Sequence, residues 1–187
     1  MGVERWSVAC EAPHVPRRVV EVQVSEWEYG CCLPPPRLGD LSEWWLDLCP
    51  GHDPACELLW TVTHGTPARG GQIWLDGGDG LHARWLSEYE PPPAPGIRLL
   101  HGALFATAHG GRRPEDPGAV RGRIERIRVM SHEMRRAPWH GTNAFERVPG
   151  SVELRDVAEG PDRFAWTTGP GRTETGLLLD LALDQRA

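Results

Sequence analysis

Residues 120–130 read VRGRIERIRVM, and this stretch gives the clearest indication of the fold. Hydrophobic and polar residues alternate with a period of two, which is typical of a β-strand with one buried face. Ile124 belongs to the hydrophobic set of the first half, whereas Ile127, three residues later, begins that of the second half. One extra residue near Glu125 accounts for this change of phase, so the sequence predicts a strand with an internal β-bulge.

Residues 19–29, VVEVQVSEWEY, show the same change of phase. Val20 and Val24 lie on one face of the predicted strand, and Trp27 and Tyr29 continue the hydrophobic pattern at odd positions. This pattern predicts a second bulged strand. Other alternating segments predict further strands at residues 41–48, 145–148, 152–157 and 177–183.

These segments favour a domain that is rich in sheet. The chain has 22 Gly and 18 Pro among its 187 residues, which favours many turns and argues against a helical bundle. Short strands with internal bulges are typical of barrels, because a bulge supplies the bend that closure needs. We therefore predict a mainly β fold, namely a small, bulged, closed or partly open antiparallel β-barrel with a short helical or hairpin insertion.

The same patterns predict the domain organisation. Residues 1–18 form an N-terminal extension, and residues 19–187 form a single β-barrel-like domain. Residues 50–96 form an insertion in that domain, in which the DGGDG sequence of residues 76–80 is typical of a hairpin turn.

Composition and charge exclude several classes of protein. The formal net charge of −6 argues against nucleic acid as a partner, and no stretch of about 18 hydrophobic residues is present to form a membrane-spanning helix. Residues 1–18 lack the apolar core of a signal peptide. We therefore expect a cytoplasmic protein without a membrane partner, in which the five cysteines are reduced.

Four short motifs occur in a characteristic order along the chain. They are WEYGCC at residues 27–32, GD at 39–40, HGGRRPED at 109–116 and VPGS at 148–151. In this order they resemble an actinobacterial small β-barrel domain family of unknown function. The resemblance implies a barrel fold and implies no activity.

Five residues are candidate metal ligands. Cys31 and Cys32 are adjacent, and Cys49, His52 and Cys56 have the spacing C-x2-H-x3-C. Thiolate and imidazole are the ligands that zinc prefers, so these residues predict a zinc site if the two groups meet in the fold. No other cofactor is assigned. The alternative is that the cysteines pack as small hydrophobic side chains.

A second group of candidates is basic. All 20 basic residues of the chain are arginines, and Arg121, Arg123, Arg126 and Arg128 are expected to face outward on either side of the predicted bulge. A row of guanidinium groups can bind phosphates or an acidic partner. The alternative is a solvated strand face without a binding role.

A third group of candidates is aromatic. The chain has nine Trp but only three Phe and two Tyr, and Trp favours half-open positions where its N–H finds a partner. We add Trp27, Trp45 and His109 to the predicted binding surface. No phosphate-binding loop, dinucleotide-binding, metalloprotease or serine-hydrolase motif occurs, so the sequence leaves open whether the protein is an enzyme.

Together these observations predict a non-catalytic small β-barrel that binds a partner through its Trp-rich and Arg-rich surface. The expected partner is another protein, and a small molecule is the alternative. Two other functions stay open. One is a zinc-binding protein or metal-dependent enzyme built on the Cys/His cluster, and the other is single-stranded nucleic-acid binding by arginines and aromatic rings on a barrel face.

Overall fold

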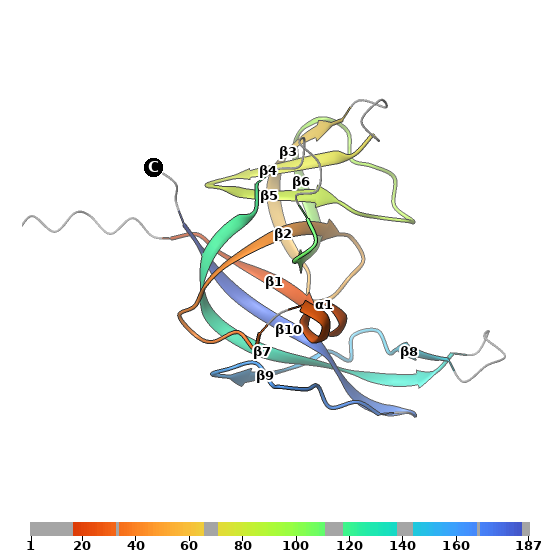
Figure 1. The fold of residues 1–187 in the computed structure, drawn as a ribbon. Helices are drawn as coiled ribbons and strands as arrows, with labels where there is room; N and C mark the ends of the chain where they lie inside the picture. The colour runs from red at the N-terminus through yellow and green to blue at the C-terminus, as the bar shows by residue number, and fades with distance from the viewer. Residues whose placement is uncertain are drawn as a thin grey trace, which may run out of the picture.

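The computed structural model describes residues 17–32, 34–65, 71–110, 118–137, 144–167 and 169–184 (Figure 1). Within these residues ten strands are linked into one sheet, and one short helix follows the first strand. The predicted mainly β fold is confirmed. The elements are β1 (Val19–Ser25), α1 (Glu26–Cys32), β2 (Leu41–Cys49), β3 (Cys56–His64), β4 (Ile73–Gly78), β5 (Leu81–Trp85), β6 (Gly96–Thr107), β7 (Val120–Arg136), β8 (Phe145–Arg147), β9 (Glu153–Val157) and β10 (Gly171–Leu183).

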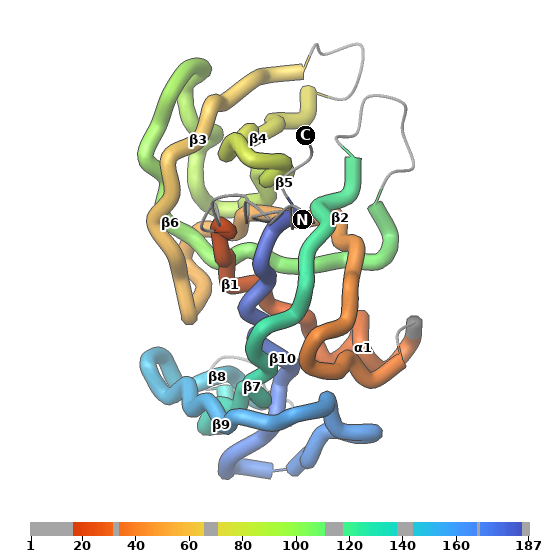
Figure 2. Tube along the Cα trace, turned by 90° about the vertical axis from the view of Figure 1, so that its left-hand side faces the viewer, coloured from red at the N-terminus to blue at the C-terminus, as the bar shows by residue number. Residues whose placement is uncertain are grey.

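The strand pairings run in two circuits. β1 pairs with β10, β10 with β7, β7 with β2 and β2 with β6, all antiparallel, and β6 pairs with β1 in parallel. β6 also pairs with β3, β3 with β4, β4 with β5, and β5 with β2. β2 and β6 therefore belong to both circuits. β3, β4 and β5 lie at one end of the molecule, and β8 and β9 lie at the other (Figure 2).

The long strands β7 and β10 run side by side through the molecule (Figure 1). Their register shifts at the predicted position: Asp180 lies opposite Arg126, whereas Leu181 lies opposite Ile124. Glu125 is thus the extra residue, and the predicted bulge in this strand is confirmed. It allows hydrophobic residues on both sides of the shift to face the core.

The second predicted bulge, in residues 19–29, is wrong. β1 ends at Ser25, and residues Glu26–Cys32 form the helix α1 instead of continuing the strand. The hydroxyl Oγ of Ser25 accepts a hydrogen bond of 3.3 Å from the backbone N–H of Glu28, so Ser25 caps the helix. The change of hydrophobic phase therefore marks the end of a strand and the start of a helix.

Residues 50–96 contribute strands to the sheet. Their described part contains β3, β4 and β5 and no helix, so of the expected helical or hairpin insertion only the hairpin is formed. β4 and β5 pair around the predicted turn, where Asp79 has a φ of 52° between two glycines that also have positive φ. Asn, Asp and Gly are the residues that favour this backbone conformation.

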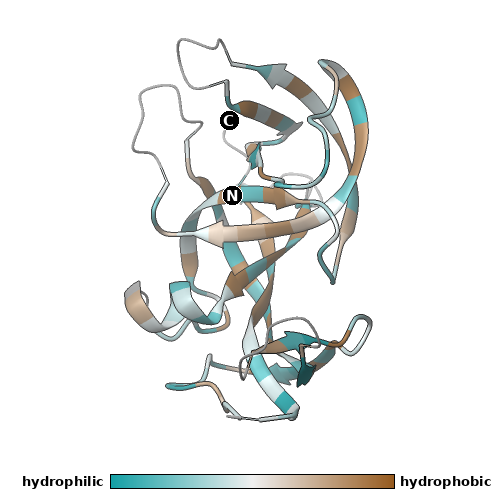
Figure 3. Cartoon of the chain, turned by 90° about the vertical axis from the view of Figure 1, so that its right-hand side faces the viewer, coloured by the Kyte–Doolittle hydropathy of each residue, from teal (hydrophilic) through white to brown (hydrophobic). Residues whose placement is uncertain are grey.

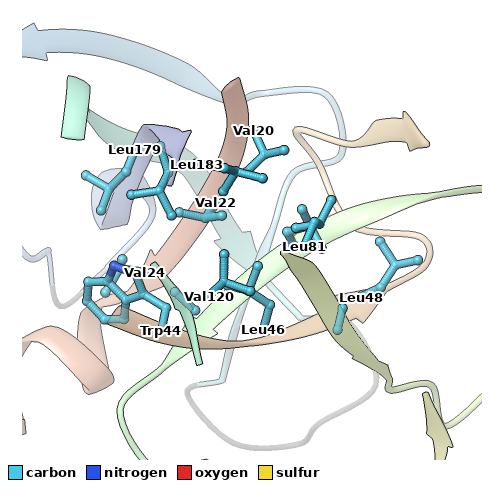
Figure 4. Close-up of a cluster of buried hydrophobic side chains, with 14 of the residues drawn as sticks. Val20, Val22, Val24, Trp44, Leu46, Leu48, Leu81, Val120, Leu179 and Leu183 are labelled. Atoms are coloured by element: carbon cyan, nitrogen blue, oxygen red, sulfur yellow. The ribbon is translucent and has the colours of Figure 1, made fainter. Parts of the chain in front are cut away.

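The core lies between the faces of the sheet where the two circuits meet. Its side chains come from most strands and include Val20, Val22, Leu46, Leu48 and Leu81, which point toward one another (Figure 4). Hydrophobic and hydrophilic residues alternate along several strands (Figure 3), as expected for strands with one buried face.

Candidate functional site

A pocket of about 540 Å³ lies where α1 and the end of β6 meet β2 and β5. This volume is typical of pockets that hold small organic molecules. Four tryptophan and phenylalanine side chains line it, and we call it the aromatic pocket. They are Trp27, Trp45, Trp74 and Phe105.

A row of side chains from four neighbouring strands forms one wall of the aromatic pocket. Trp74 on β4 lies opposite Arg84 on β5. Arg84 lies opposite Asp47 on β2, which in turn lies opposite Phe105 on β6. Adjacent residues of a strand point to opposite faces, and the residues adjacent to Asp47 are buried in the core. Leu46 and Ala106 belong to the core and also line the aromatic pocket, so the core lies directly against this wall.

An ion pair joins the two central members of this row. Arg84 donates two hydrogen bonds to Asp47, from Nε to Oδ1 at 2.7 Å and from Nη2 to Oδ2 at 2.8 Å. Such a bidentate arrangement is the strongest that a guanidinium and a carboxylate make. It fixes both side chains and cancels their charges within the pocket.

A buried carboxylate also lines the aromatic pocket. Glu28 is only 8% exposed, and its Oε1 accepts a hydrogen bond of 2.6 Å from the hydroxyl of Thr107. Its Oε2 accepts a weaker bond of 3.3 Å from the backbone N–H of Ala108 and lies 3.7 Å from Nε2 of His109. These contacts attach α1 to the end of β6.

Two polar atoms of the aromatic pocket have no hydrogen-bond partner among the described residues. They are the indole N–H of Trp45 and the side-chain oxygen Oε1 of Gln72, and both are shielded from solvent. Gly110 lies against the ring of Trp45 so closely that a side chain at position 110 would overlap it. A buried polar atom without a partner costs free energy, and Nε1 of Trp60 and Nε of Arg128 are two further atoms of this kind outside the pocket.

The candidate metal ligands in the described part of the chain do not form a cluster. Among the described residues, no group of three or more His, Cys, Asp or Glu side chains is arranged to hold a metal ion. Cys49 and His52 line the aromatic pocket, and the ring of His52 packs edge-on against Phe105 at 5.3 Å between centroids. The thiol of Cys56 instead donates to the backbone oxygen of Gly102 at 3.3 Å.

Of the two adjacent cysteines, Cys31 differs from the prediction of reduced thiols, and the side chain of Cys32 is not described. Cys31 takes part in a disulfide, so the expectation of five reduced cysteines is wrong for this residue. The side chain of Cys32 lies outside the described part of the structure.

Burial, aided by the charge of Asp47 and opposed by that of Arg84, raises the pKa of Cys49 to about 12. Its thiol therefore stays protonated at neutral pH.

Three of the four arginines of the predicted binding surface are exposed, as expected, but bond within the chain. Arg121 pairs with Glu43, and Arg123 donates to the backbone oxygen of Gly39. Arg126 makes two hydrogen bonds to Asp156 on β9, of 2.6 and 2.9 Å. These bonds occupy the guanidinium groups and are those of a strand face stabilised by its neighbours.

Arg128 does not face solvent. It is 6% exposed, which contradicts the expected outward orientation. Its guanidinium donates to Glu21 on β1 at 2.7 Å and to Asp180 on β10. Glu21 and Asp180 lie opposite each other in the β1–β10 pair, so two neighbouring strands supply the carboxylates that cover Arg128.

The aromatic members of the predicted binding surface do come together. Trp27, Trp45 and His109 all line the aromatic pocket, and the rings of Trp27 and His109 lie 5.6 Å apart between centroids. They arrive from α1, β2 and the segment after β6, which are separated in sequence. Trp27 is 65% exposed and lies at the rim of the pocket.

Sequence reasoning missed several polar residues of the aromatic pocket, among them Glu28, Asp47, Arg84 and Gln72. A signal existed for Glu28, because a serine followed three residues later by glutamate is typical of a capped helix start. The alternation of residues 41–48 also places Asp47 on the same face as Trp45. Nothing local indicated Arg84 or Gln72, since their place depends on pairings between distant strands.

Comparisons with known proteins give a family and no relative of known activity. No curated protein and no solved structure matches the chain. No helix among the described residues is long and apolar enough to cross a membrane. A family of unknown function, DUF6578, matches residues 18–183, which include the segment 50–96. The match spans most of the chain, and the protein therefore belongs to the family of unknown function DUF6578.

Proposed function

We propose that this protein is a non-catalytic binding protein and that its ligand is a small organic molecule held in the aromatic pocket. One observation carries the proposal: the shielded N–H of Trp45 and the shielded Oε1 of Gln72 have no partner among the described residues, and both residues line the same pocket. A ligand that accepts from Trp45 and donates to Gln72 would satisfy both atoms.

The surroundings of these atoms support a ligand with a flat, apolar body. Trp74 and Phe105 supply aromatic surface on the wall formed by the strands, and Trp27 supplies it at the rim. Aromatic rings in such pockets contribute most of the buried area, while a few polar groups set the orientation. An aromatic or cyclic amide has this combination of a ring, an acceptor and a donor.

Two features support binding without catalysis. Cys49, the cysteine that lines the aromatic pocket, has a pKa raised to about 12 by burial, so it supplies no thiolate at neutral pH. The hydroxyl of Thr107 donates to Glu28, and the carboxylate of Asp47 is held by Arg84. These polar groups are engaged in holding the pocket together.

The other expected partners have less support. A protein or a nucleic acid would use the arginines of β7, and Arg121, Arg123, Arg126 and Arg128 all bond within the chain. The zinc alternative lacks a cluster of ligands among the described residues.

We also propose that the two strand circuits form two closed barrels that share β2 and β6. The complete series of strand pairings supports this proposal.

The proposed function is tested with benzamide, which carries a ring, a carbonyl acceptor and an amide donor. Saturation-transfer NMR on the full chain is expected to detect binding of benzamide and weaker binding of toluene. Trp45→Phe keeps the ring and removes the N–H, and Gln72→Met removes the acceptor. Each is expected to weaken benzamide binding about three- to tenfold, the usual effect of one hydrogen bond.

The matched control is Tyr89→Phe, because Tyr89 is 94% exposed and lines none of the described pockets. It is expected to leave benzamide binding unchanged. If benzamide does not bind, or if Trp45→Phe and Tyr89→Phe affect binding equally, the proposed function is wrong.

A further inference from the structure

A second pocket, of about 630 Å³, lies between the start of α1 and the sheet formed by β7, β8 and β10. It shares Ser25 and Trp27 with the aromatic pocket, so the two pockets flank the same tryptophan. We call it the Arg147 pocket, after the one arginine among its described lining residues.

Arg147 differs from the arginines around it. Arg135 pairs with Glu146 at 2.7 Å, and Arg155 pairs with Glu174 at 2.8 Å. The guanidinium of Arg147 makes neither an ion pair nor a hydrogen bond with any described residue, although its position opposite Met134 directs it toward the pocket that both line. Arg147 is exposed as a whole residue, and partial desolvation by the atoms around its guanidinium lowers its pKa.

Three threonine hydroxyl groups line the Arg147 pocket together with the guanidinium of Arg147. Thr173 and Thr175 are buried on β10 and line the Arg147 pocket together with Thr167. Thr175 shares a hydrogen bond of 2.8 Å with Nδ1 of His132, and Thr167 donates to the backbone oxygen of Gly169 at 2.8 Å. Hydroxyl and guanidinium groups together are typical ligands of carboxylate and phosphate oxygens.

The charge of His132 does not alter this environment at neutral pH. Burial, followed by the positive charges of Arg147 and Arg172, lowers the pKa of His132, so its ring stays neutral. Glu26 is the one carboxylate among the described residues that line the pocket. Arg147 and Glu26 are thus the two charged groups that face a ligand there.

Exposed aromatic rings border the pocket. Trp166 is 67% exposed and lines the pocket from the segment before β10, and Trp27 lines it from α1. Large exposed aromatic side chains at the edge of a hollow provide flat surfaces on which a ligand ring can stack.

We infer that the Arg147 pocket binds an aromatic ligand that carries an oxyanion, with Arg147 and Thr173 holding the anionic group and Trp166 stacking on the ring. This site lies beyond the aromatic pocket and does not depend on the function proposed for it. The anionic group is a carboxylate or a phosphate, both of which a guanidinium can bind through two hydrogen bonds.

The test uses phenyl phosphate, benzoate and the neutral analogue benzyl alcohol as probes. Isothermal titration calorimetry on the full chain is expected to show saturable binding of at least one of the two anions and at least tenfold weaker binding of benzyl alcohol. The stronger of the two anions identifies the group that the pocket prefers. The absence of saturable binding by both anions, or equal binding of benzyl alcohol, overturns the inference.

Variants then assign the binding to Arg147. Arg147→Gln is expected to weaken anion binding roughly tenfold or more, since it removes a charge-assisted contact. The matched control is Arg163→Gln, because Arg163 is an exposed arginine that lines none of the described pockets. If both variants weaken binding equally, the effect comes from net charge alone and the inference is wrong.

Glu26→Gln gives an independent test that does not remove Arg147. It removes the negative charge that faces the anion, so binding is expected to become tighter, by about twofold or more at low ionic strength. Unchanged or weaker binding by this variant contradicts the inference, even if Arg147→Gln fails to fold.

Discussion

Asp47 and Arg84 lie opposite each other on the parallel strands β2 and β5 and are joined by two hydrogen bonds, of 2.7 and 2.8 Å. Only two residue pairs are in register between these strands, so this ion pair is a large part of their connection. It also forms the centre of the wall of the aromatic pocket. The contact thus joins the stability of the sheet to the shape of the candidate site.

Removal of this charge is expected to destabilise the protein. Asp47→Asn leaves the guanidinium of Arg84 beside a neutral amide, and the loss of a partly buried, charge-assisted contact is expected to lower the free energy of unfolding by about 1–3 kcal/mol. The control is Asp156→Asn, which breaks the solvent-exposed pair with Arg126. Urea denaturation checks both variants, and a larger loss for Asp156→Asn contradicts this account of the sheet.

The start of α1 is predicted to depend on Ser25. Ser25→Ala removes the hydroxyl that accepts from the backbone N–H of Glu28 and is expected to cost about 1 kcal/mol of stability. Ser25→Asp keeps an acceptor at the same position and is expected to retain most of the stability. Thermal denaturation followed by circular dichroism measures both, and equal melting temperatures for all three proteins would show that the cap contributes nothing.

A buried leucine and an exposed leucine are predicted to contribute very differently to stability. Leu48 on β2 is fully buried, and Leu48→Ala is expected to lower the free energy of unfolding by about 2–5 kcal/mol because it leaves a cavity. Leu59 on β3 is 58% exposed, and Leu59→Ala is expected to change stability by about 0.5 kcal/mol or less. Chemical denaturation distinguishes the two, and a similar cost for both would place the core elsewhere.

Cys49 gives the stability a predicted dependence on alkaline pH. Its pKa is about 12 in the folded protein and has an ordinary value of 9.0 when the thiol is exposed. Between these values the folded state binds more protons than the unfolded state, so stability falls as the pH rises above 9. Urea denaturation at pH 8 and pH 10 is expected to show this loss in the wild-type protein and a smaller loss in Cys49→Ala. An identical loss in both proteins would assign the effect to other groups.

The strands were predictable where one face of a strand is buried along its whole length. Residues 41–48 alternate because the side chains of Leu46 and Leu48 face the core while Asp47 faces the pocket. Glu125 was predictable as a bulge because a strand can change hydrophobic phase only by adding a residue. Residues 26–32 were wrongly assigned, since a short helix and a shifted strand give the same pattern over so few residues.

The candidate site was only partly predictable. Trp27, Trp45 and His109 were identified by residue type, but the row from Trp74 to Phe105 depends on pairings between strands far apart in sequence. Arg128 was placed on the surface because alternation describes only its own strand. Its burial comes from carboxylates on β1 and β10, which no local pattern reveals.

The claim that the aromatic pocket holds a small ligand is tested by following the indole N–H signal of Trp45 in a proton–nitrogen correlation spectrum. The signal is identified among those of the nine tryptophans by its absence in Trp45→Phe. On titration with benzamide it is expected to shift downfield and to saturate, because a shielded N–H gains an acceptor, while the signal of Trp60, which is buried in the core and lines none of the described pockets, stays in place. A Trp45 signal that does not move at saturating benzamide would contradict the claim that this pocket holds a small ligand.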